Sequence, residues 1–73
     1  MTNTALLEKI IKDKGIKKAR IAKAIGVSYG WLKKKINNEV DFKACEIQEL
    51  CSLLGIDDLE LKDKIFFDKD VGK

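Results

Sequence analysis

The chain has no histidine and no proline, and its two cysteines are Cys45 and Cys51. Without histidine, these thiols do not make up the ligand set of a structural zinc site, and we expect neither a metal nor a cofactor. Six residues apart on one helix, the thiols would be separated by about 9 Å of rise and face different directions, too far for a disulfide. We therefore expect two reduced, half-buried thiols that act as small hydrophobic residues.

Long apolar runs are missing as well. No stretch approaches the ~20 residues of a membrane span, and the first ten residues, MTNTALLEKI, lack the basic and then apolar segments of a signal peptide. We expect a protein of the cytoplasm of a bacterial or phage-infected cell. Neither a nucleophile–base pair, nor paired carboxylates in a plausible pocket, nor a phosphate-binding loop can be recognised, so an enzyme is not expected.

A length of 73 residues suits one domain with a small core. We expect that domain to span residues 1–73, with its core at about 4–65 and a short tail at 66–73. Strict alternation of apolar and polar residues, the sign of a strand, is missing. The spacing of apolar residues instead predicts an all-α fold with helices at about 4–14, 18–25, 29–36, 44–54 and 58–65.

Residues that start and stop helices support these boundaries. Asn3 or Thr4 can cap the first helix, Ser28 can cap the third, and the pair Asp57 and Asp58 can cap the fifth. Lys17 is a poor cap for the second. Residues that tolerate the left-handed conformation stand at the carboxyl ends of the first four helices, namely Gly15, Gly26, Asn37 or Asn38, and Gly55.

Charge is distributed unevenly along the chain. Residues 1–37 hold ten lysine and arginine residues against two carboxylates, whereas residues 38–73 hold five lysines against ten carboxylates. This asymmetry suggests an anionic partner for the amino half. On charge alone, an ordinary solvated lysine-rich surface explains it equally well.

The stretch ARIAKAIGVSYGWLKK, residues 19–34, joins two helices of about eight residues through Gly26, Val27 and Ser28. Glycine allows the positive backbone angle at the end of the first helix, and serine starts the second. Ala22 is small enough to let the two helices cross closely, and Val27 can fill the corner. The pattern predicts a helix-turn-helix.

The sequences IAKAIGVSYGWLKKKIN and FKACEIQELCSLLGI resemble the Cro and repressor type of phage helix-turn-helix domain, the xenobiotic response element family. The resemblance extends over about residues 4–65 and implies a compact five-helix fold like that of the lambda repressor domain. The chain is also similar to small Cro-like regulators of Firmicute phages. It departs from the family pattern at three positions: Lys17 replaces the usual Ser/Thr cap, Gly30 has no side chain to read a base, and Lys35 stands where many members carry an apolar or aromatic residue.

The resemblance further implies that the helix at 29–36 lies in the DNA major groove. Four residues then fall at base-contacting positions: Tyr29, Gly30, Lys33 and Lys34. Five more are candidates for phosphate contact: Lys18, Ser28, Trp31, Asn37 and Lys43. Other uses stay open, since each lysine can serve a base or a phosphate, Tyr29 and Trp31 can pack within the protein, and Gly30 can simply be tolerated.

A single module of this size would bind DNA weakly. We therefore expect a weak homodimer, or a dimer that forms on a palindromic operator, with Leu59, Phe66 and Phe67 as its possible interface. The opposite possibility, in which both phenylalanines pack within the monomer, is equally consistent with the sequence.

We thus expect a double-stranded-DNA-binding transcriptional regulator, a repressor or Cro-like protein of a phage or prophage switch. The chain's ending soon after the fifth helix favours a short Cro-like regulator, although a truncated repressor domain would have the same sequence. The alternative is a protein-interaction module on the same scaffold, such as an antirepressor or an antitoxin.

Overall fold

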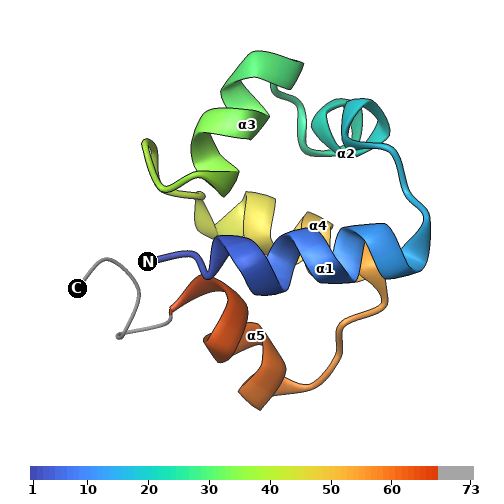
Figure 1. Cartoon of the computed structure of the whole chain (residues 1–73), viewed down its shortest axis with the longest axis vertical. Helices are drawn as coiled ribbons and strands as arrows, with labels where there is room; N and C mark the ends of the chain where they lie inside the picture. Colours follow the sequence, from blue (N-terminus) through green and yellow to red (C-terminus); the bar gives the residue numbers. More distant parts are fainter. Residues whose placement is uncertain (68–73) are drawn as a thin grey trace.

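In the computed structural model, which describes residues 1–67, the chain forms five α-helices (Figure 1). They are α1 (Thr4–Lys14), α2 (Lys18–Ile25), α3 (Tyr29–Ile36), α4 (Ala44–Leu54) and α5 (Leu59–Phe66). No strand occurs within residues 1–67. The all-α fold predicted from apolar spacing is confirmed.

The first four helices have the predicted bounds, and the fifth lies one residue later than predicted. Its N-cap is Asp58, whose Oδ1 accepts a hydrogen bond from the Glu60 N–H at 3.0 Å. The helix therefore starts at Leu59, and it continues to Phe66, the first residue of the predicted tail. Residues 68–73 of that tail lie outside the described residues.

Local capping explains most of these boundaries. Asn3 Oδ1 accepts from the Leu6 N–H at 3.1 Å, and Ser28 Oγ accepts from the Trp31 N–H at 3.1 Å. Lys17 occupies the N-cap of α2 with its backbone only, because its side chain is no acceptor. Gly26 ends the same helix with φ +78°, a conformation that glycine adopts without the strain of a Cβ.

All five helices contribute to one hydrophobic core. α1 crosses the middle of the molecule, with α2 and α3 towards one end and α5 at the other (Figure 1). α1 contacts α3, α4 and α5, while α2 packs on α3 and α4. The buried apolar residues are Leu7, Ile11, Ile21, Ala22, Leu32, Ile36, Ile47, Leu50, Cys51, Leu54, Ile65 and Phe66.

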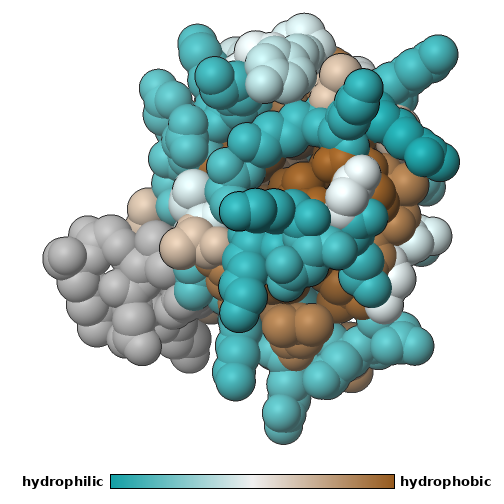
Figure 2. All heavy atoms as spheres, turned by 45° about the vertical axis from the view of Figure 1, so that its right-hand side comes forward, coloured by the Kyte–Doolittle hydropathy of each residue, from teal (hydrophilic) through white to brown (hydrophobic). Residues whose placement is uncertain are grey.

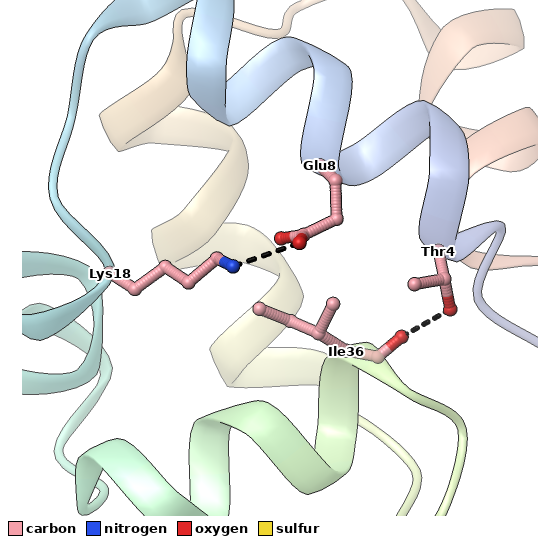
Figure 3. A network of polar contacts seen from close by, with 4 residues as sticks. All are labelled: Thr4, Glu8, Lys18 and Ile36. Atoms are coloured by element: carbon pink, nitrogen blue, oxygen red, sulfur yellow. Dashed lines mark hydrogen bonds and ion pairs between the residues drawn. The ribbon is translucent and has the colours of Figure 1, made fainter.

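Polar contacts from α1 hold both α2 and α3 in place. The Thr4 hydroxyl donates to the carbonyl of Ile36 at the end of α3, and Glu8 Oε2 pairs with Lys18 Nζ of α2 at 2.8 Å (Figure 3). One helix thus braces the two that follow it, which restricts their relative movement.

The amino-terminal residues are anchored at two places. The Asn38 side chain accepts from the Thr2 N–H at 2.7 Å and donates to the Thr2 carbonyl at 2.6 Å. The Asn3 N–H donates to the Ile65 carbonyl of α5 at 2.6 Å. Asn38 has φ +66°, so of the two asparagines predicted for this turn it is the one that adopts the left-handed conformation.

The longest described helices, α1 and α4, have 11 residues each, and no helix within residues 1–67 is long and apolar enough to cross a bilayer. Cys51 is buried and Cys45 is exposed, so the expectation of two half-buried thiols was wrong for both. Burial raises the pKa of the Cys51 thiol, although nearby Lys62 acts in the opposite direction.

Candidate nucleic-acid interface

The corner between α2 and α3 has the geometry that the sequence predicts. After the left-handed Gly26, the Val27 N–H donates to the Ala22 carbonyl at 2.9 Å. Val27 is half-buried against the core, and Ser28 caps α3. Because Ala22 itself is buried and small, α2 and α3 pack directly on each other. These features form a helix-turn-helix.

α3 has one face in the core and one in solvent. Leu32 and Ile36 are buried, four residues apart, as expected. The exposed residues of α3 are Tyr29, Gly30, Trp31, Lys33 and Lys34. In Figure 2, long hydrophilic side chains project at the upper end of the molecule, where α2 and α3 lie. The four predicted base-contacting residues therefore share one exposed, basic surface.

Both lysines on this exposed face of α3 lie over aromatic rings. Lys33 Nζ is 5.8 Å from the centroid of the Tyr29 ring, and Lys34 Nζ is 5.5 Å from that of Trp31. A cation above a ring face is attracted by the ring's quadrupole, by about 0.5–1 kcal/mol at an exposed site. Both ammonium groups are thereby restrained while they stay accessible to a ligand.

Lys35, the third lysine of the run, is 1% exposed. Its Nζ donates to the Asp41 carbonyl at 3.0 Å and pairs with Glu46 Oε1 of α4 at 2.9 Å. The ammonium also lies 5.9 Å from the ring centroids of both Trp31 and Phe42. The aliphatic stem of Lys35 thus lies in the core, and its charge is neutralised inside the protein.

Glu46 is the counterpart of this buried lysine. Its Oε1 also accepts from the Lys43 N–H at 2.8 Å, which satisfies an amide at the start of α4. Burial by itself raises the pKa of Glu46, but the Lys43 N–H and the Lys35 ammonium together outweigh it and hold the pKa below its ordinary value. Glu46 therefore links the end of α3 to the beginning of α4. Sequence reasoning missed this pair, and the one signal for it was the lysine at an apolar family position.

The residues predicted to contact phosphates lie in different settings. Ser28, Trp31, Asn37 and Lys43 are exposed, at the two ends of α3 and at the N-cap of α4. Lys18 is only partly exposed and its ammonium is paired with Glu8. A phosphate at Lys18 would thus compete with a carboxylate of the same protein.

The predicted self-association patch needs a correction at Phe66. This residue is 4% exposed and packs edge-on against Phe42, with ring centroids 5.4 Å apart. It belongs to the monomer core because it ends the buried stripe of α5. Phe67 and Leu59 are 53% and 74% exposed. Only these two of the three predicted residues present an apolar surface to solvent.

The described geometry defines the class of protein: a helix-turn-helix module whose second helix has a solvent-exposed, basic face. A family model of the Cro/C1-type HTH DNA-binding domain matches residues 7–61, which is most of the chain. The chain belongs to this family, and with it to the DNA-binding regulators of transcription. Searches of curated proteins and of solved structures gave no significant match.

Proposed function

We propose that the protein is a sequence-specific transcriptional regulator, a repressor or Cro-like protein that acts in a phage or prophage genetic switch. The observation that carries the proposal is the exposed face of α3, on which Lys33 and Lys34 lie in solvent beside Tyr29 and Trp31. In this class of motif the second helix enters the major groove, and the first crosses the backbone.

Within the proposed complex, residues near the start of α3 read the bases. The ammonium groups of Lys33 and Lys34 donate to acceptors on base edges, and the Tyr29 ring and hydroxyl contact a base pair beside them. Gly30 lets the backbone approach the groove closely. As a set, the base-contacting residues are Tyr29, Gly30, Lys33 and Lys34.

Phosphate contacts fix the register of the helix on the duplex. The proposed donors are the side chains of Lys18, Ser28, Trp31, Asn37 and Lys43. Ser28 already accepts a hydrogen bond from the Trp31 N–H, which leaves its hydroxyl proton for a phosphate oxygen. Lys18, Lys33, Lys34 and Lys43 each bring one positive charge to the duplex, whether they contact a base or a phosphate. If each charge displaces a counterion, log K falls with log salt with a slope of roughly −3 to −4 per half-site.

We further propose that two copies bind a palindromic operator in the cytoplasm. One module buries little DNA surface, and a two-fold axis would place two α3 helices about one helical turn apart. Exposed Leu59 and Phe67 are the candidates for contact between the copies.

The test is charge reversal on α3. Lys34→Glu, at an exposed position, should keep the fold yet reduce affinity for duplex DNA by more than tenfold. The substitution removes an ammonium group that DNA attracts and puts in its place a carboxylate that the DNA phosphates repel. Lys64→Glu is the matched control, since Lys64 is also exposed but lies on α5. Fluorescence anisotropy at two salt concentrations measures both. Equal losses for the two variants, or absence of duplex binding by the wild-type chain at low salt, would overturn the proposal.

A further inference from the structure

The exposed face of α3 is almost purely a donor surface. Between Asp13 and Glu39 the sequence contains no aspartate, glutamate or glutamine. Lysine ammonium and the indole N–H of tryptophan are donors only. The first six residues of α3 therefore offer a base edge two ammonium groups, one indole N–H and the hydroxyl of Tyr29.

The acceptors nearest to this surface are already occupied or lie elsewhere. Ser28 Oγ accepts from the Trp31 N–H, and the Asn37 amide is at the carboxyl end of the helix, away from the first turn. The exposed carboxylate of Glu39 lies beyond the carboxyl end of α3, and the buried carboxylate of Glu46 is taken up by Lys35 and by the Lys43 N–H. The Tyr29 hydroxyl is thus the main side-chain acceptor left on the exposed part of α3.

Base edges in the major groove differ in the donors and acceptors that they present to such a surface. Guanine presents two acceptors, O6 and N7, and thymine presents O4 with a methyl group beside it. Adenine presents an amino donor beside its one acceptor, N7, and cytosine presents an amino donor alone. An ammonium facing an amino group finds two donors together, which leaves both without a partner in the complex.

The positions of the ammonium groups make this discrimination effective. Each exposed lysine lies over an aromatic ring of the same helix, Lys33 over Tyr29 and Lys34 over Trp31. Restrained side chains lose less conformational entropy on binding and cannot so easily turn away to a phosphate. Lys35, which would otherwise add a third mobile charge, is withdrawn into the core.

We propose, building on the function proposed above, that α3 selects operators by their keto bases. Guanine stands opposite Lys33 and Lys34, and thymine stands opposite Tyr29, whose ring contacts the thymine methyl. Each half-site then has guanine and thymine together on the strand that faces the start of α3. Swapping the two bases of any of these pairs between the strands weakens binding.

The experiment starts from a duplex library with randomised half-sites. The wild-type chain, Lys33→Ala, Lys34→Ala and the control Lys64→Ala are each used for selection, and the enriched pools are sequenced. We expect guanine at two positions with the wild type and with Lys64→Ala, and loss of one of these preferences with each α3 variant. The three substituted positions are exposed, and circular dichroism checks that the variants fold.

Modified bases in the selected duplex then test individual atoms. Replacing guanine by 7-deazaguanine, which removes the N7 acceptor but keeps base pairing, should reduce affinity by about three- to tenfold at each lysine position. Exchange of the guanine–cytosine pair should reduce it on the order of tenfold. Uracil in place of thymine should lower the affinity of the wild type more than that of Tyr29→Ala.

The outcomes separate this inference from the proposed function. Sequence-specific binding with adenine or cytosine at the lysine-dependent positions, or affinity unchanged by 7-deazaguanine, would overturn keto selection and leave a DNA-binding regulator. Binding of all duplexes with equal affinity would also overturn it. Failure to bind any duplex would overturn both.

Discussion

At the residue scale, the pair of Lys35 and Glu46 decides how the end of α3 meets the start of α4. Taking two charges out of water costs several kcal/mol per ion, so the pair is stable only because its hydrogen bonds are made. Lys35 has both Glu46 Oε1 and the Asp41 carbonyl as acceptors, and Glu46 Oε1 has two donors. Removing one partner leaves an uncompensated buried charge.

Glu46→Gln should lower the free energy of unfolding by about 3 kcal/mol at neutral pH, because the Lys35 ammonium loses its counter-ion. The folded-state pKa of Glu46 is below the ordinary value of 4.5, so the stabilisation by its carboxylate is full above that pH and is lost as the pH falls towards the lowered pKa. The difference in the free energy of unfolding between wild type and Glu46→Gln should therefore become smaller below pH 4.5. Urea denaturation between pH 3 and 7 measures it.

The control is Glu49→Gln, an exposed carboxylate on the same helix, which should change stability by no more than about 0.5 kcal/mol. If Glu46→Gln does not fold, the double variant Lys35→Met with Glu46→Leu should recover the fold, since apolar residues of similar size can replace a buried ion pair. If Glu46→Gln lowers the free energy of unfolding by the same amount at every pH between 3 and 7, the lowered pKa of Glu46 does not contribute to stability and the prediction is wrong.

At the scale of the element, α3 combines a strong N-cap with a weak first turn. Ser28 caps it, but Gly30 is the second residue of this eight-residue helix. A Cβ placed on Gly30 would meet none of the described atoms within 4 Å, and its φ is not positive. Neither packing nor backbone conformation within the described protein therefore requires glycine there. A constraint on this position, if there is one, acts in the complex with DNA.

Gly30→Ala should stabilise the free protein by up to about 1 kcal/mol, because alanine is the better helix former. We expect the same variant to bind its operator more weakly, since the new methyl group lies on the face proposed to enter the groove. Ala19→Gly, at the matching second position of α2, is the reverse control and should destabilise by a similar amount. Thermal unfolding measures the stability of each variant, and fluorescence anisotropy measures its affinity for the operator. Operator affinity that rises or stays the same would show that glycine is merely tolerated at this position.

At the scale of the whole molecule, α3 and α5 lie at opposite ends (Figure 1). The basic helix-turn-helix is at one end and α5 at the other; exposed Leu59 is the first residue of α5, and exposed Phe67 follows its last residue. Phe67 also borders a hollow of about 280 Å³ with Met1, Phe42 and other residues. Neither residue lies on the helix-turn-helix, so contact between two copies through Leu59 or Phe67 would leave the proposed DNA-binding faces uncovered.

Replacing both Leu59 and Phe67 by serine should leave the fold intact, because both side chains are already exposed. It should weaken the joint binding of two copies to a palindromic duplex and shift the stoichiometry towards one copy per duplex. Analytical ultracentrifugation with labelled DNA measures this. Phe66→Ser is the contrasting variant and should lower the free energy of unfolding by about 3 kcal/mol or more, since it leaves a cavity in the core. Unchanged cooperativity in the double variant would rule out this surface as the interface.

The helices were predictable because their signals are local. Apolar spacing, Ser28 as a cap and Gly26 as a stop all act within a few residues, so four helices have their predicted bounds. The one-residue error at α5 came from two adjacent aspartates, either of which is a good cap. The structure shows that Asp58 is the N-cap, because its side chain accepts a hydrogen bond from the Glu60 N–H. The sequence alone does not show which of the two aspartates makes this bond.

The candidate site was only partly predictable. The exposure of Tyr29, Lys33 and Lys34 follows from the position of the Leu32 and Ile36 stripe on the same helix. The pairing of Lys18 with Glu8 does not follow from any local pattern, because it joins two successive helices whose relative placement is set by the packing of the core.

By itself, the amino-acid sequence determined the all-α class, the helix-turn-helix corner and the basic character of α3, because these depend on neighbours in the chain. Tertiary structure alone decided which of three consecutive lysines is buried and which of two consecutive phenylalanines enters the core. Burial depends on what the other helices supply: Lys35 meets Glu46 of α4, and Phe66 meets the Phe42 ring. Residues adjacent in sequence, with the same side chain, thereby acquire opposite roles.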